Sequence, residues 1–374
     1  MLMVVFGAGA SFDSSPTYQP RPPVAVSTYP PTFVPTPTTQ EMNESRFRPP
    51  LADELFQNRP NFEEKVRAYR QMSGIISDLR HREGKTVEQC LQDFQIESKE
   101  HPHRRSQLAA VRYYLRDVLA ECTRGWLNVM QGASNYSTLL DRIATYHKDT
   151  KPVLLVTFNY DRLLDDALID RGLRLTKIDD YVFGNGGHAF FKLHGSVNWA
   201  HILGSPLPGA EIHHRFLIAD PPTFDREYPF ILNDDFADLK NNQVLFPALA
   251  IPMREKGKFE CPGTHQEQLR NAIPKVTKIV FIGWSAGETN FLTMLAEGLE
   301  ALDSFVVVSV AADADATGNR IREALGKRGY HARSLVSKGG FSHFMLGKEC
   351  NAFLENRYQQ LEPLKIRRSV NHIA

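Results

Sequence analysis

Three polar side chains follow apolar runs of the sequence, at points where buried strands would end. The run Phe190 to Leu193 leads directly into His194, and the run 153–158 leads into Asn159 and Asp161. An imidazole has an unperturbed pKa near ~6.5 and exchanges a proton close to neutral pH. A carboxamide holds a water or a hydroxyl, and a carboxylate stabilises developing positive charge. The alternative for His194 is a core histidine bonded to a backbone carbonyl.

The same pattern recurs at every apolar run that resembles a strand. Small, polar or flexible residues follow each of five runs, namely GAGAS (7–11), FNYD (158–161), HGS (194–196), GWSAGETN (283–290) and VAADADATG (310–318). In open α/β sheets, ligands bind beyond the carboxyl ends of the strands. We therefore expect these five segments to line one crevice.

Strand and helix patterns alternate over much of the chain. Uninterrupted apolar runs predict strands, and three- and four-residue apolar spacing predicts the helices between them. The strands are expected at 2–6, 153–158, 190–193, 278–283 and 305–310, and the helices at 161–172, 289–302 and 319–329. The order favours an α/β fold, a Rossmann-like parallel sheet with helices on both faces. Residues 200–270 show no organisation that the pattern resolves.

Two segments depart from this alternation. Residues 51–147 carry amphipathic helical stripes throughout, which predicts an inserted all-helical subdomain. Residues 12–50 are rich in proline, which predicts a long loop without helix or central strand. The expected organisation is the first strand, the GAGAS turn and this loop at 1–50, and the helical insertion at 51–147. The rest of the α/β core is expected at 148–350, and a tail at 351–374.

Composition excludes several classes of protein. The 374 residues carry a formal net charge of +1, so no global charge favours nucleic acid or a membrane surface. The apolar run in MLMVVFG is too short for a signal peptide or a membrane span. The four cysteines lie far apart without a C-x-x-C pair, which argues against a zinc site or a disulfide scaffold. His213 and His214 beside Glu211 are more typical of a solvated loop than of a metal site. We expect a cytoplasmic protein without a metal.

The GAGAS segment is a weak signal by itself. Gly7 and Gly9 allow a tight turn and a close approach of backbone amides to a pyrophosphate. Phe12 stands where the dinucleotide fingerprint has its third glycine, so a simple turn is the alternative. The sequence has no P-loop motif, which disfavours a P-loop nucleotidase.

Four motifs in order resemble the sirtuin-like NAD-binding domain. They are GAGAS (7–11), TFNYD (157–161), KLHGS (192–196) and GWSAGETN (283–290), and the resemblance covers roughly residues 1–11 and 150–345. The N-Y-D form, and HGS followed by Asn198-Trp199, look more like bacterial antiphage-defence proteins than like protein deacylases. Two departures agree with this. The chain lacks the zinc ribbon of classical sirtuins, and SFDSSP stands where those carry a Pro-Asp-Phe-Arg-like segment.

The resemblance implies binding and cleavage of NAD+, with Asn159 and His194 as the catalytic pair and no metal. Asn159 would hold a water or the ribose, and His194 would act on a ribose hydroxyl or on that water. Gly195 would let the backbone pass close to the sugar, and Thr289 would cap the following helix. The residues expected to contact NAD+ are Gly7, Ala8, Gly9, Ser11, Asp161, Gly195, Ser196, Gly283, Ser285, Thr289 and Asp313.

The resemblance also implies a role and partners. The expected activity is hydrolysis of NAD+ to nicotinamide and ADP-ribose, which depletes NAD+ in antiphage defence. The alternatives are a module that senses NAD+ or ADP-ribose without turnover, and an NAD-dependent protein deacylase or ADP-ribosyltransferase. Expected partners are further copies of the chain and a HerA-type ATPase or another operon-encoded defence protein, with the helical segment 51–147 as the candidate contact. No membrane or direct nucleic-acid binding is expected.

Overall fold

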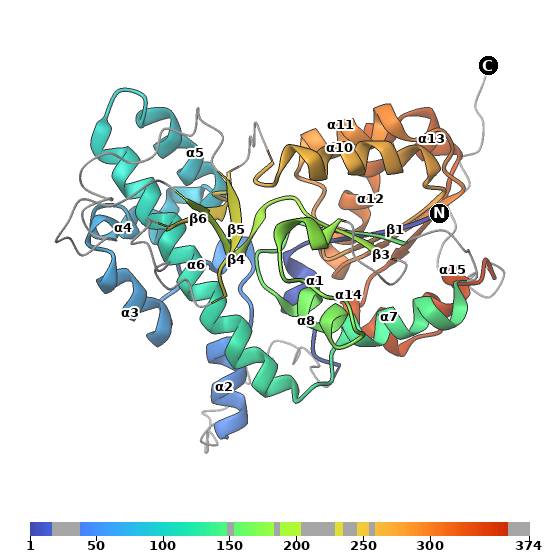
Figure 1. Cartoon of the computed structure of the whole chain (residues 1–374), viewed down its shortest axis with the longest axis horizontal. Coiled ribbons are helices and arrows are strands. Elements are labelled where there is room, and N and C mark those ends of the chain that lie inside the picture. The colour runs from blue at the N-terminus through green and yellow to red at the C-terminus, as the bar shows by residue number, and fades with distance from the viewer. Residues whose placement is uncertain are drawn as a thin grey trace, which may run out of the picture.

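A six-stranded parallel sheet forms the centre of the molecule (Figure 1). The computed structural model describes residues 1–16, 38–147, 153–182, 188–202, 229–234, 245–253 and 259–357. The strand order is β3-β2-β1-β7-β8-β9, and each neighbouring pair is parallel. The strands are β1 (Leu2–Phe6), β2 (Val153–Thr157), β3 (His188–Lys192), β7 (Lys278–Ile282), β8 (Ser304–Val308) and β9 (Arg333–Ser337).

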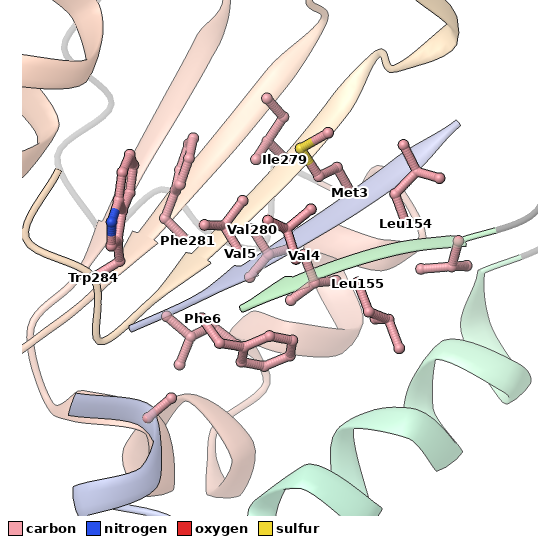
Figure 2. Packing of buried hydrophobic residues seen from close by; sticks show 14 of the residues in the cluster. Met3, Val4, Val5, Phe6, Leu154, Leu155, Ile279, Val280, Phe281 and Trp284 are labelled. Carbon is pink, nitrogen blue, oxygen red and sulfur yellow. The ribbon is translucent and has the colours of Figure 1, made fainter. Parts of the chain in front are cut away.

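The sheet is buried because its strands are apolar on both faces. All five residues of β1 are inaccessible to solvent, and β2, β7 and β8 are buried along their whole length. Figure 2 shows side chains of β1, β2 and β7 pointing alternately to the two faces. A strand buried on both faces needs an uninterrupted apolar run rather than an alternating one. This is why LMVVF predicts β1 to the residue, and why the run 278–283 predicts β7 with only Gly283 in excess.

Helices cover both faces of the sheet, which confirms the predicted fold class (Figure 1). On one face lie α7 (Asn135–Tyr146), α8 (Leu163–Ile169), α14 (Gly340–Leu346) and α15 (Glu349–Leu354). On the other lie α10 (Gly263–Ala272), α11 (Thr289–Gly298), α12 (Ala311–Leu325) and α13 (Lys327–His331). The short α1 (Ala8–Phe12) follows β1 directly.

A second, antiparallel sheet lies between the parallel sheet and a group of helices (Figure 1). It consists of β4 (Gly195–Ile202), β5 (Phe230–Leu232) and β6 (Leu245–Leu249), in the order β5-β4-β6. The sequence pattern does not predict this sheet, because β4 follows β3 after only Leu193 and His194. The second strand therefore begins where we expected only a loop at the end of the first.

Most helices of segment 51–147 lie beside the antiparallel sheet, whereas α7 covers one face of the parallel sheet (Figure 1). The helices of this segment follow α2 (Thr39–Phe47) and comprise α3 (Pro60–Ala68), α4 (Ile76–His81), α5 (Val87–Glu97), α6 (Pro102–Met130) and α7, with 3-10 turns at Ala52–Glu54, Arg70–Gly74 and Arg82–Gly84. Further 3-10 turns lie at Ile178–Tyr181 and Ile273–Lys275. The 29-residue α6 contributes to two cores. Its residues from Leu108 to Cys122 pack with β4 and β6, whereas Trp126 and Met130 pack with the parallel sheet.

The structure corrects four details of the sequence prediction. Residues 39–47 of the expected proline-rich loop form α2, because the stretch after Thr38 lacks proline and begins with a capping box between Thr38 and Glu41. The remaining proline-rich residues 17–37 lie outside the described part of the chain. GAGAS begins a helix rather than a plain turn, and α12 starts at Ala311 instead of residue 319. The helix expected at 161–172 is limited to α8, whose N-cap residue is Arg162.

Candidate functional site at the carboxyl ends of the parallel strands

The polar motifs meet where the sheet reverses its strand order. Chain order runs from β1 outward to β2 and β3 in one direction, and from β7 to β8 and β9 in the other. The carboxyl ends of β1 and β7 are therefore the topological switch point at which α/β proteins bind ligands. GAGAS follows β1, FNYD follows β2, HGS begins one residue beyond Leu193, and GWSAGETN follows β7.

The glycines of the switch point allow two loops to pack on each other. The Gly9 amide donates to the Gly283 carbonyl at 3.0 Å, and the Gly7 amide donates to the Ile282 carbonyl at 3.0 Å. A Cβ atom at Gly7 would lie 2.6 Å from the Gly283 oxygen, and one at Gly283 would lie 2.2 Å from the Ala10 nitrogen. Glycine is therefore required here because the two loops pack closely on each other. We expected it for a different reason, the close approach of the backbone to a pyrophosphate.

A first cluster of polar side chains lies between α1, the end of β2 and α7, and consists of Ser11, Tyr136, Asn159 and Asp161. The Asn159 Nδ2 atom donates to the Gly7 carbonyl and to Ser11 Oγ, both at 2.9 Å, and lies 3.3 Å from the Tyr136 hydroxyl. Ser11 and Tyr136 share a further hydrogen bond of 2.9 Å. We call these four residues the Asn159 cluster. Its members are almost fully buried.

Asp161 belongs to this cluster and also bonds the first residue of α8. Its Oδ1 atom accepts from the Leu163 amide at 3.1 Å. Burial raises the pKa of the Asp161 carboxyl, while the Lys192 ammonium and a hydrogen bond with Ser11 act in the opposite direction. Lys192 donates to the Asp161 carbonyl at 2.6 Å and to Asp165 Oδ2 at 2.8 Å. A buried ammonium therefore fixes the backbone of the N-Y-D segment.

A second cluster surrounds the imidazole, and we call it the His194 cluster: Phe158, Tyr160, His194, Trp284 and Glu288. The His194 ring centre lies 4.8 Å from that of Phe158 and 6.0 Å from that of Tyr160. Trp284 stacks on Phe158 at 5.5 Å and donates its indole N–H to Glu288. The other carboxylate oxygen of Glu288 faces His194 Nε2 at 3.9 Å.

The two predicted catalytic side chains contact different neighbours. Phe158 and Tyr160 both pack against His194, whereas Asn159 between them points toward α1 and Ser11. Along an extended backbone, alternate side chains point in opposite directions. The tripeptide therefore joins the two clusters: Asn159 extends into one and its neighbours into the other.

The HGS turn is shaped by the antiparallel sheet. Gly195 has a φ of +78°, and a Cβ atom there would lie 1.8 Å from the Ala248 carbonyl oxygen of β6. The close backbone approach that glycine permits is thus to β6, where we expected it toward a sugar. Ser196 is fully buried, and its hydroxyl lies 3.4 Å from the Tyr160 carbonyl. These contacts attach the turn to the N-Y-D segment.

The remaining predicted ligand contacts lie nearer the surface. Ala8 is half-buried, while Ser285, Thr289 and Asp313 are exposed. Glu288 occupies the N-cap position of α11, so Thr289 is the first residue of the helix and not its cap. Asp313 lies in the first turn of α12. The structure brings Ser11, Asn159 and Asp161 into contact. Ser285, Thr289 and Asp313 lie at the surface instead.

The sequence prediction does not name Tyr136, Lys192 or Glu288 as site residues. Tyr136 belongs to the helical segment, and no local sequence pattern marks it as a site residue. Lys192 carries a signal, because a lysine within the apolar run FFKL must find a buried partner. Glu288 also carries one, as the charged residue of the GWSAGETN loop.

The described residues contain neither a group of side chains that could hold a metal ion nor a helix that could span a membrane. Over those ranges, no group of three His, Cys, Asp or Glu side chains is placed to hold a metal ion. No described helix has the length and apolar character needed to cross a bilayer. His213, His214 and Glu211 lie outside the described ranges.

Comparisons with known proteins give matches among solved structures only. No family model matches the sequence, and no curated protein matches it. A mutant Sir2 homologue in complex with ADP-ribose is similar over 96% of this chain and 93% of that chain, with a TM-score of 0.37 and 11% identity. A complex described as Sir2, p53 peptide and NAD+ is similar over 97% of this chain and 94% of that chain, with a TM-score of 0.30 and 12% identity.

Proposed function

We propose that this protein hydrolyses NAD+ to nicotinamide and ADP-ribose. The observation that carries the proposal is a buried amide and carboxylate beyond β2 and a buried imidazole beyond β3, in two clusters joined by residues 158–160 beside the switch point of a parallel sheet. The order of the four motifs along the sequence supports NAD+ as the ligand.

The chemistry requires few groups. Nicotinamide leaves NAD+ as a neutral molecule, so its departure needs no general acid, unlike the leaving group of an ordinary glycoside. What accelerates the reaction is orientation of the ribose, stabilisation of its developing positive charge, and a base for the attacking water. Asn159, Asp161 and His194 are the three side chains to which we assign these roles.

The contacts of Asn159 limit what it offers to a ligand. Its two N–H groups are directed to the Gly7 carbonyl and Ser11 Oγ. The carbonyl acceptor at Gly7 also fixes which end of the amide is the nitrogen. Asn159 therefore presents its Oδ1 atom, an acceptor for a ribose hydroxyl or for the attacking water.

Nicotinamide release by the purified protein tests this proposal. Wild type and the variants Asn159→Ala and His194→Ala are incubated with NAD+, alone and with a candidate operon partner. Asn61→Ala and His265→Ala are matched controls, because both residues are buried and contact groups outside the two clusters, the Arg46 carbonyl and the Trp199 ring. We expect at least ~100-fold slower release in the site variants and wild-type rates in the controls. Equal rates in all five proteins would refute the assignment.

Binding without turnover is a second candidate function. The specific observation in its favour is that Asn159 and His194 contact different neighbours. A sensor would bind NAD+ or ADP-ribose in a calorimetric titration and release no nicotinamide in any assembly state. A deacylase or ADP-ribosyltransferase would form product only when a peptide or another acceptor is added.

We also propose that the activity serves antiphage defence, in a homo-oligomer and with a HerA-type ATPase or a similar partner. The helical segment 51–147 is the proposed contact. Cellular NAD+ is measured after phage infection of bacteria that carry wild type or His194→Ala. Loss of NAD+ with both proteins, or with neither, would exclude this role.

A further inference from the structure

Glu288 carries an interaction that helix capping does not explain. It is the N-cap residue of α11, and its carbonyl accepts from the Phe291 and Leu292 amides, each at 3.1 Å. These backbone bonds begin the helix without any help from the carboxylate. The side chain makes no capping bond and extends toward the β2 and β3 loops instead.

The two oxygens of the Glu288 carboxylate have different neighbours. Oε2 accepts the indole N–H of Trp284, and Oε1 lies 3.9 Å from His194 Nε2. The Glu288 side chain is 16% exposed and that of His194 is 3% exposed. A carboxylate this close to an imidazole is placed to stabilise positive charge that develops on the ring.

Aromatic packing fixes both partners of this pair. Trp284 is held between Phe158 and Phe281, with interplanar angles of 8° and 19°. His194 is held by Phe158 and Tyr160. Neither ring turns without disturbing several others, so the direction of each polar atom is set before a ligand arrives.

We infer that Glu288, oriented by Trp284, is the positioning residue that holds the His194 imidazole and stabilises its imidazolium during the reaction. This rests on the proposed hydrolysis of NAD+. In the step concerned, a water or ribose O–H bond breaks and an N–H bond forms on the imidazole. The oxygen keeps the electron pair for bond formation, and the ring acquires the positive charge that faces Glu288. A separation of 3.9 Å is longer than a hydrogen bond, and such contacts shorten when substrate binds.

The variant Glu288→Gln separates positioning from structure. Glutamine keeps the size of the side chain and an oxygen that accepts from Trp284, and it replaces the charged oxygen that faces His194 with a neutral NH2 group. We expect kcat for nicotinamide release to fall about ten- to a hundredfold with little change in KM. Glu288→Asp should restore part of the loss. The matched control is Glu297→Gln, an exposed glutamate on the same helix, which should behave as wild type.

A double substitution tests whether Glu288 acts through His194. In a His194→Ala background, Glu288→Gln should cause no further loss, because the group it assists is gone. Wild-type kcat in the single variant, or an equal loss in both backgrounds, would overturn the inference.

A spectroscopic measurement keeps this test separate from the proposed function. The ring nitrogens of His194 are observed by 15N NMR in wild type, Glu288→Gln and Glu297→Gln at one pH, with His194→Ala to assign the signals. We expect only Glu288→Gln to shift them toward the neutral ring. If wild type releases no nicotinamide, the proposed function fails, and these signals still decide whether Glu288 and His194 are paired. Unchanged signals in Glu288→Gln would refute the pairing.

Discussion

Replacing Lys192 by methionine should destabilise the protein severely. The Lys192 ammonium and the Asp165 carboxylate are completely buried and lie 2.8 Å apart. Asp165 also accepts from the Tyr181 hydroxyl at 2.9 Å, and Lys192 donates to the Asp161 carbonyl at 2.6 Å. Methionine fills a similar volume but leaves one buried carboxylate without a counter-charge.

The magnitude follows from these contacts. An uncompensated charge in a buried pair costs about 3–5 kcal/mol. The lost donor to the Asp161 carbonyl adds about 1–3 kcal/mol. The sum is comparable to the whole free energy of unfolding of many domains, about 5–15 kcal/mol. We therefore expect Lys192→Met to be largely unfolded or to unfold at much lower urea concentration than wild type.

A second substitution shows whether charge is the cause. Asp165→Asn keeps an acceptor for Tyr181 and removes the carboxylate charge. The double variant Lys192→Met, Asp165→Asn should regain about 2–3 kcal/mol relative to Lys192→Met. Urea denaturation followed by circular dichroism measures all three proteins. The reasoning is refuted if Lys192→Met lies within about 1 kcal/mol of wild type, or if the double variant is no more stable than the single one.

Three further predictions concern stability. Gly195→Ala should cost about 3 kcal/mol or more, because its Cβ meets the Ala248 carbonyl at a positive φ, whereas Gly172→Ala, at a φ of +87° with open space around it, should cost only about 1 kcal/mol. Thermal unfolding of the two variants checks this difference, and equal losses would contradict it. Burial raises the pKa of Asp166 to about 6, so its ionisation destabilises the folded state increasingly as pH rises from about 4 to about 6. Asp166→Asn should then exceed wild type by about 1–2 kcal/mol at pH 7.5 and lose this advantage at pH 4, after allowance for its partial exposure; urea titrations at both pH values decide. Burial lowers the pKa of Lys278 to about 8, so the folded state bears the full cost of its charge below pH 8 and loses that cost as pH rises toward ~10.5. Wild type should gain stability relative to Lys278→Met between pH 8 and pH 10, and a constant difference across that range would exclude this account.

The sequence predicts five of the six strands of the parallel sheet and misses β9, whose residues RSLVS begin with an exposed arginine and form no continuous apolar run. A strand buried on both faces needs an apolar run, and the local sequences of β1, β2, β7 and β8 are such runs. The antiparallel sheet was missed for the opposite reason. Its strand β4 mixes polar and apolar residues in GSVNWAHI, and it is stabilised by partners more than 25 residues away along the chain.

The residues of the candidate site also differ in whether a local sequence pattern predicts them. Ser11, Asn159, Asp161 and His194 were found because each follows a strand, a rule that operates along the sequence. Tyr136 was not found, since it reaches Asn159 from a helix that only the tertiary fold brings near. The glycines at 7, 9 and 195 stand where loops pack closely, and the crowding atoms belong to Gly283 and Ala248, which no local pattern connects to them.

The long helix α6 makes the two cores mechanically dependent on each other. Its N-terminal part is packed among residues of the antiparallel sheet, and its last turns are packed among those of the parallel sheet. A force or a partner that displaces one end of this rigid rod must move the other end as well. The chain should therefore lose both cores in a single calorimetric transition, and a protease that cuts within α6 should release neither half as a stable fragment.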